Sequence, residues 1–264
     1  MRKAFRYCIG ALVCTSFTCT SFIVGAVEPE FQWSSGVDFT TGKYSDAEST
    51  DILFIPASVK ALFGDFEAKL TVPYIRIKGP GTIVGGGDVG VVARTRLPGG
   101  ITTQDGLGDV TLALTYTRLM QDNSLFVDFT GKVKLPTASS DKNLGTGKAD
   151  FTAQIDLTKA LGDVTVFGMA GRRFMGSSQA LPLRDGFIGS VGTAYKMSDL
   201  ASIGVIYDYR ESASFRLDAE GASELTGYIA WKLSKRVRLQ TYGVLGLSKG
   251  SPDTGVGIQL SFRP

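Results

Sequence analysis

The chain has 264 residues, 28 basic and 25 acidic side chains, and no histidine. A net charge of +3 is too small to form the basic footprint of a nucleic-acid-binding protein, so we expect no nucleic-acid partner. Its 33 glycines and scarce helical periodicity predict an all-β protein.

The N-terminus has the layout of a secretory signal peptide. Three basic residues among the first six precede an uncharged stretch at 7–24, and the small residue Ala26 follows. We therefore predict that residues 1–26 are a cleaved signal peptide. The alternative, an N-terminal membrane anchor, needs ~20 apolar residues, whereas this stretch is shorter and rich in Ser and Thr.

Cleavage would change the chemistry of what remains. The signal peptide holds all three cysteines, Cys8, Cys14 and Cys19, and its basic residues account for the whole net charge. Residues 27–264 would then form a single domain without a disulfide or a thiol metal ligand, and we expect no cofactor.

Twelve segments of this domain alternate between apolar and polar residues, which predicts β-strands with two unlike faces. In chain order they are residues 31–43, 52–62, 66–77, 109–120, 125–135, 150–161, 164–173, 186–196, 201–210, 224–233, 237–247 and 255–262.

Every second connection between these segments is short and has the composition of a tight turn. The short connections are 63–65, 121–124, 162–163, 197–200 and 234–236. The others are longer, and the longest, the Gly-rich segment 78–108, contains a G-x-G-x-x-G pattern at Gly85, Gly87 and Gly90. No Rossmann unit surrounds that pattern, so we interpret it as part of a flexible loop.

This alternation of short and long connections is typical of an outer-membrane β-barrel, which has short periplasmic turns, longer external loops and an even number of strands. The strand lengths agree, because a tilted membrane strand needs ~9–11 residues. We predict a transmembrane antiparallel up-and-down barrel of about twelve strands in the outer membrane of a Gram-negative bacterium, surrounded by lipid. A soluble barrel, with the apolar series inside, is the alternative.

The stretch from Leu125 illustrates what the membrane version implies for the two faces. Val127, Phe129 and Val133 alternate with Asp128, Thr130 and Lys132. In a membrane barrel the apolar series faces lipid and the polar series faces inward. Aromatic residues near strand ends fit girdles at the two membrane interfaces: Phe31, Trp33, Tyr74, Tyr116, Phe151, Phe187, Tyr195, Tyr209, Trp231 and Phe262.

The same parity predicts which charged and amide side chains line a pore. They are Glu67, Lys69, Asp128, Lys132, Lys134, Gln154, Asp156, Asp208, Arg210, Lys232, Arg238 and Gln240. The alternative is that they pair and fill the interior. Twelve strands should leave a narrow path between paired charges, and the excess of basic residues predicts a mild anion preference.

Several motifs resemble the outer-membrane β-barrel transporter family of the phenol-degradation (MetA-like) type. They are GLGDV at 106–110, KLPT at 134–137, LGTGKADF at 144–151 and LGD at 161–163. The resemblance implies a twelve-stranded channel for small solutes, aromatic or hydrophobic ones included. The C-terminal strand GIQLSF at 257–262 resembles the signal that the outer-membrane assembly machinery reads, which makes that machinery an expected partner.

These observations predict an outer-membrane channel for the passive passage of small solutes through a narrow charged lumen. Two alternatives remain: a non-conducting structural or adhesin-like barrel, and a barrel enzyme. We predict no enzymatic activity, since the chain lacks the histidine that barrel hydrolases use as general base. We predict no metal site, although Asp105 and Asp109 could hold calcium at the outer rim.

Overall fold

The computed structural model describes residues 29–44, 48–80, 83–84, 92–93, 100–120, 124–139, 141–179, 181–215 and 219–264. The predicted signal peptide and the glycine pattern at 85–90 lie outside these ranges. Among the described residues no helix is long and apolar enough to cross a membrane.

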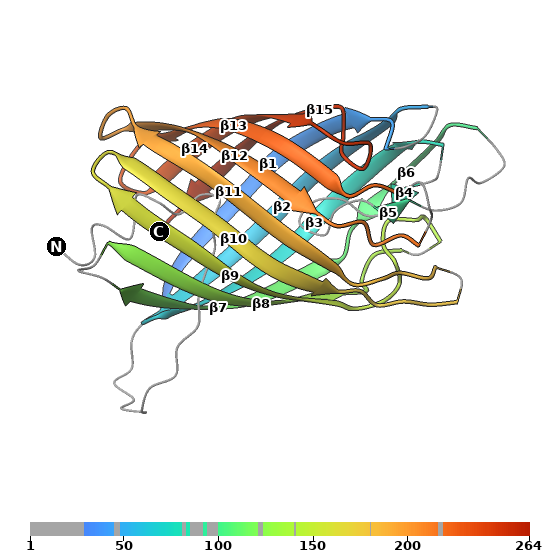
Figure 1. Cartoon of the computed structure of the whole chain (residues 1–264), viewed down its shortest axis with the longest axis horizontal. Helices are drawn as coiled ribbons and strands as arrows, with labels where there is room; N and C mark the ends of the chain where they lie inside the picture. Colours follow the sequence, from blue (N-terminus) through green and yellow to red (C-terminus); the bar gives the residue numbers. More distant parts are fainter. Residues whose placement is uncertain are drawn as a thin grey trace.

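Twelve antiparallel strands of the described chain close into a barrel (Figure 1). They are β1 (Glu30–Gly42), β2 (Thr50–Phe63), β3 (Phe66–Gly79), β7 (Val110–Met120), β8 (Leu125–Leu135), β9 (Asp150–Leu161), β10 (Val164–Phe174), β11 (Gly186–Lys196), β12 (Ala201–Arg210), β13 (Ala222–Lys232), β14 (Val237–Gly246) and β15 (Thr254–Phe262). Each strand pairs with its sequence neighbour, and β1 pairs with β15 to close the ring. The predicted fold class is therefore confirmed, and all twelve predicted strands agree with the observed bounds to within two residues.

One element of the wall was not predicted. Strand β6 (Thr102–Leu107) pairs with the Tyr74–Gly79 half of β3, whereas β7 pairs with the other half of β3. The break between β6 and β7 falls at glycines: Gly106 has a φ of 155°, a conformation that costs glycine little. A Cβ on Gly108 would lie 2.5 Å from Ile75 Cδ1. Two short strands, β4 (Ile83–Val84) and β5 (Val92–Ala93), form a separate ribbon.

The two ends of the barrel differ, as the connection lengths predicted. The short turns lie at the end that also carries the C-terminus, and the longer connections gather at the opposite end (Figure 1). Gly64 and Gly162 occupy two of the tight turns with φ of 63° and 66°, values that side-chain-bearing residues seldom adopt. By analogy with outer-membrane barrels we call the end with longer connections the external end.

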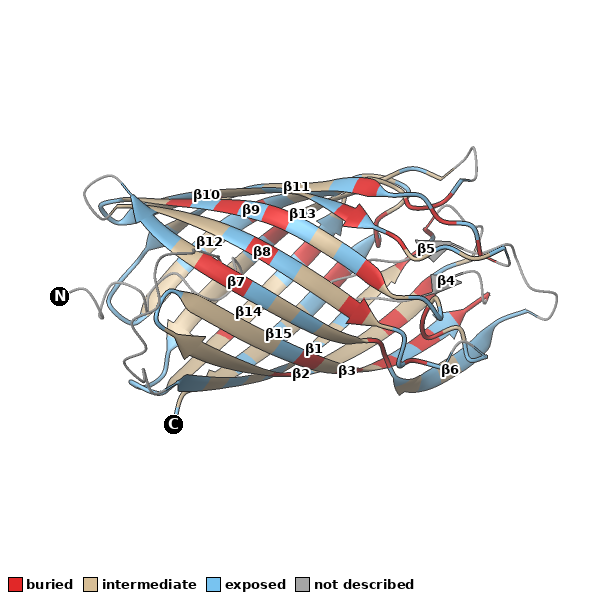
Figure 2. Cartoon of the chain, turned by 90° about the horizontal axis from the view of Figure 1, so that it is seen from below, coloured by how far each residue is buried: buried red, intermediate tan, exposed pale blue. Residues whose placement is uncertain are grey.

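The outward face of the barrel is apolar and exposed, while the inward face holds most of the buried polar residues (Figure 2). Trp33, Phe151 and Val191 point outward with exposed fractions of 55%, 53% and 60%. On the other face Thr115 and Asp156 are 1% and 2% exposed. This inversion of the soluble pattern is what a hydrocarbon surrounding requires, because apolar side chains then meet lipid rather than water.

The inversion yields a stability prediction on β8. Phe129→Arg places a cation on the lipid face near the middle of the strand and should lower the free energy of unfolding by ~2–4 kcal/mol. Lys132→Arg, on the inward face, keeps its charge and should leave stability nearly unchanged. Urea unfolding of both variants in lipid vesicles measures the difference, and equal stabilities would contradict the assignment of the faces.

Candidate functional site

All twelve residues that the alternation of the sequence predicts to face inward lie on the inward face in the cross-strand register. Asp128 lies opposite Asp156, Lys134 opposite Asp150, and Asp208 opposite Glu224. The remaining members follow the same register: Glu67, Lys69, Lys132, Gln154, Arg210, Lys232, Arg238 and Gln240. Sharing this face makes them candidates for a pore lining, and that role stays a prediction.

Sequence reasoning missed seven further charged residues that the described strands place on this face. They are Glu30, Asp38, Lys60, Asp150, Arg173, Lys196 and Glu224. Four are acidic and three basic, so the excess of positive charge that suggested anion preference nearly disappears. The alternation of the sequence could have found all seven, because each continues the alternation of a predicted strand, within it or at its margin.

Three buried charges form a cluster at the external end of β8. Lys134 Nζ lies 3.0 Å from Asp109 Oδ2, 2.6 Å from Asp150 Oδ2, and 3.0 Å from Thr146 Oγ1. All three charged side chains are at most 7% exposed. Two carboxylates around one ammonium satisfy the rule that a buried charge must be paired.

The same carboxylates hold the external loops. Asp109 Oδ1 accepts a hydrogen bond from the backbone N–H of Ala138, and Asp150 Oδ1 accepts one from that of Gly176, at 2.9 and 2.8 Å. Gly145 passes so close that a Cβ there would lie 2.8 Å from both oxygens of Asp109. The cluster therefore ties β7, β8 and β9 to the loops that follow β8 and β10.

An apolar cluster lies at the external mouth beside these charges. Ile52, Ile75 and Ile77 point inward from β2 and β3 and are at most 7% exposed. Tyr44, Ala138 and Leu144, from the loops after β1 and β8, pack on them, and Leu144 is 1% exposed. Loop side chains thus cover part of the inner wall and narrow the opening at this end.

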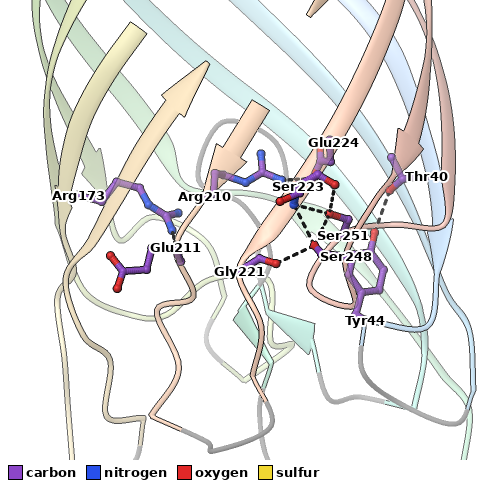
Figure 3. A network of polar contacts seen from close by, with 10 residues as sticks. All are labelled: Thr40, Tyr44, Arg173, Arg210, Glu211, Gly221, Ser223, Glu224, Ser248 and Ser251. Carbon is purple, nitrogen blue, oxygen red and sulfur yellow. Dashed lines mark hydrogen bonds and ion pairs between the residues drawn. The ribbon is translucent and has the colours of Figure 1, made fainter. Parts of the chain in front are cut away.

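A second polar network lies on the wall formed by β10, β12 and β13 (Figure 3). Arg210 forms an ion pair with Glu224 on the neighbouring strand, and Arg173 donates to the backbone carbonyl of Glu211 at 3.1 Å. Figure 3 shows the Arg210 side chain directed toward Glu224 and that of Arg173 toward Glu211. These side chains place opposite charges along one wall of the mouth.

Serine hydroxyls fasten the neighbouring loop to β13. Ser251 donates to the carbonyl of Ser223 and accepts from its N–H, both at 2.8 Å, while Ser248 donates to the carbonyl of Gly221 at 2.7 Å (Figure 3). Ser251 is 1% exposed. Because these bonds join the two hydroxyls to backbone groups, they hold the loop between β14 and β15 against this part of the rim.

Tyr44 occupies the loop between β1 and β2 with a positive φ of 48°. Its hydroxyl lies 3.3 Å from Thr40 Oγ1. Burial raises the pKa of Tyr44 to about 12, against a smaller opposing effect of the Thr40 hydrogen bond. The phenol therefore stays protonated across the physiological range and contributes a neutral polar group to the mouth.

Deeper in the barrel, the inner wall differs from one side to the other. On β8 and β9 it is polar: Gln154 donates to both carboxylate oxygens of Asp156, which faces Asp128. On β10 to β12 it carries the apolar side chains Phe167, Met169, Ile188 and Ile206 between glycines, together with the polar Ser190 and Asp208. One side of the inner wall is thus polar, and the other combines apolar with polar side chains.

Aromatic rings on the inward face fold back against glycines of the next strand. Phe167 covers Gly192, and Tyr228 covers Gly204, so a Cβ at either glycine would overlap the ring. Tyr242 covers Gly257 in the same way and donates to Asp38 Oδ2 at 2.7 Å. Rings that lie along the wall take less of the lumen than rings that project into it.

Asp105 and Asp109, the two carboxylates considered for calcium, contact different partners and do not lie in one cluster. Asp105 Oδ2 accepts a hydrogen bond from Tyr74 Oη at 2.9 Å on the outward side, whereas Asp109 belongs to the Lys134 cluster. In the described part of the chain, no three acidic residues are arranged to hold a metal ion.

Solved structures similar to this chain are outer-membrane channels and porins. The COG4313 outer membrane channel from Pseudomonas putida F1 has a TM-score of 0.67 at 12% identity, over 92% of this chain and 100% of that chain. The NanC porin has a TM-score of 0.56 at 8% identity, over 88% and 100% of the two chains. The Ralstonia pickettii toluene transporter TbuX has a TM-score of 0.50 at 11% identity, over 89% of each.

At these identities the likeness shows the fold, which is that of Gram-negative outer-membrane barrels and supports an outer-membrane location. No protein-family model matches the chain, and neither does any curated protein. The resemblance to the phenol-degradation (MetA-like) family is therefore not confirmed, although the outer-membrane β-barrel fold that it implied is.

The buried cluster predicts a large effect of one substitution. Lys134→Met leaves the carboxylates of Asp109 and Asp150 buried without their cation and should lower the free energy of unfolding by ~3–5 kcal/mol. Lys249→Met is the matched control, since Lys249 forms an ion pair with Glu220 at the surface and exposed pairs contribute little. Denaturant unfolding compares them. A similar decrease in the free energy of unfolding for both variants would contradict a stabilising role of the buried Lys134 cluster.

Proposed function

We propose that this protein is a passive outer-membrane channel for small solutes. The observation that carries the proposal is a closed barrel whose inward face is polar and charged along β8 and β9 while its outward face is apolar. Charged groups on the inward face cost less if water reaches them, and a lumen that water reaches can also admit small polar solutes. The fold of the channels and porins described above supports the same conclusion.

We infer that the passing solutes carry both an apolar body and a polar group. The wall of β10 to β12 presents Phe167, Ile188 and Ile206 beside Asp208, whereas β8 and β9 present Asp128, Gln154 and Asp156. A small aromatic or otherwise hydrophobic molecule with a hydroxyl or carboxyl substituent would contact both walls at once. The neighbours of similar fold include a toluene transporter, which supports an apolar component.

The second candidate is a non-conducting barrel with a structural or adhesive role. It is favoured by the packing at the mouth, where Leu144 is 1% exposed against Ile75 and Ile77. Planar-bilayer recording of the purified, folded protein separates the two. Discrete openings in the presence of salt are expected for a channel, and a protein that stays closed to ions and small organic solutes would support the second candidate.

Lumen charge should control ion selectivity. Lys132→Glu on β8 should shift the reversal potential in a KCl gradient toward cations, by an amount that corresponds to a change of about twofold or more in permeability ratio. Arg118→Glu is the control, because Arg118 is exposed on the outward face near the short-turn end. Equal shifts for both variants would indicate that Lys132 does not face the conducting path.

The loop after β8 should restrict the mouth. Leu144→Asp buries a carboxylate among Ile52, Ile75 and Ile77, so the loop should leave this position because an unpaired buried charge is costly. Single-channel conductance is then expected to rise by about twofold. Leu247→Asp, at a side chain that is 58% exposed in another external loop, should not change it. An unchanged conductance in the Leu144 variant would contradict a restricting role of this loop.

A further inference from the structure

A cationic side chain stands on the lipid-facing surface near the external end of β10. Arg172 points outward, opposite Phe187 on β11, while the next residue, Arg173, points inward. The Arg172 guanidinium carbon lies 5.7 Å from the ring centre of Phe174 and 5.1 Å from that of Phe187. Both distances lie within the range of cation–π attraction.

The charge of Arg172 is only weakly balanced by protein groups. Its Nη2 lies 4.0 Å from Asp185 Oδ2, which is the outer limit of an ion pair, and the other oxygen of Asp185 accepts a hydrogen bond from the Met175 N–H. The side chain of Arg172 is 49% exposed. Both rings lie within cation–π distance of the guanidinium, and its partial exposure leaves N–H groups available at the surface.

Arg172, Phe174 and Phe187 lie at a height along the barrel that corresponds to the lipid headgroups. Phe174 and Phe187 are 44% and 59% exposed at the external ends of their strands, which is where the aromatic girdle of an outer-membrane barrel meets lipid headgroups. A cation is poorly tolerated at the bilayer midplane and well tolerated at this level. Arg172 therefore lies among headgroups rather than among acyl chains.

The surface below Arg172 suits the tail of a lipid. On the outward face, Ala170 lies opposite Gly189, and Gly168 follows toward the middle of the barrel. Larger apolar side chains flank this low strip, with Ile155 on β9 and Val191 on β11 exposed by 46% and 60%. A chain of methylene groups could lie along the strip while its headgroup meets the guanidinium.

We propose that Arg172, Phe174 and Phe187 form a binding site for the phosphate of an anionic lipid headgroup in the external leaflet. The planar guanidinium donates charge-assisted hydrogen bonds to phosphate oxygens, which it matches better than an ammonium does. The occupant is a phosphorylated glycolipid of the lipid A type, whose acyl chains cover the apolar strip. This site lies on the outside of the barrel and does not depend on whether the lumen conducts.

Native mass spectrometry of the folded protein in detergent tests this site with bis-phosphorylated lipid A as probe. Arg172→Gln should weaken lipid binding about tenfold, and Arg172→Lys about threefold because the charge stays while the paired N–H donors of the guanidinium are lost. Arg118→Gln, at an outward-facing arginine near the opposite end, should stay within about twofold of the unsubstituted protein. A heat-dependent gel shift confirms that each variant is folded.

The lipid itself supplies the second arm of the experiment. Lipid A stripped of its phosphates should bind at least about tenfold more weakly to the unsubstituted protein and show no further loss with Arg172→Gln. The proposal is overturned if Arg172→Gln binds lipid A as well as the unsubstituted protein does. It is also overturned if the dephosphorylated lipid binds equally, if equimolar inorganic phosphate displaces the lipid, or if a second copy of the chain occupies the face.

Discussion

Backbone hydrogen bonding in a hydrocarbon surrounding is the constraint on which the rest of this structure depends. Lipid offers no partner for an N–H or C=O group, so a sheet within the membrane must close on itself. The pairing of β1 with β15 achieves this, and the antiparallel register carries the same parity around twelve strands. Once the ring is closed, each strand side chain faces either lipid or the lumen. The position of a residue in the alternation then decides whether it lies on the face that a solute could contact.

Closure also creates a confined interior in which charges must find partners. The arrangement of Lys134 between Asp109 and Asp150 answers this requirement and holds two external loops through backbone N–H groups. The same confinement explains why Phe167 and Tyr228 lie over glycines rather than across the lumen. Pairing at the mouth and flattened rings along the wall together determine how much of the interior is left for a solute.

The strands could be predicted because their signal is local. Strand β8 (Leu125–Leu135) shows strict alternation and was placed to the residue. Strand β6 (Thr102–Leu107) was missed because its residues, TTQDGL, lack that alternation and gain their partner only from the end of β3 that projects past β7. The inward charges Arg173 and Glu224 stand at the last and first positions of predicted strands, and extending the same alternation to these positions would have placed them inward.

The sequence by itself determined the twelve strands of the closed ring, the two ends of the barrel and which residues of a strand share a face, because period-two alternation and turn composition are properties of neighbouring residues. Only the tertiary structure decided that Leu144 and Tyr44 would turn inward onto Ile75, and that Asp109 and Asp150 would share one lysine. Those contacts join segments far apart in the chain, and their energies depend on burial, which exists only after the barrel has closed.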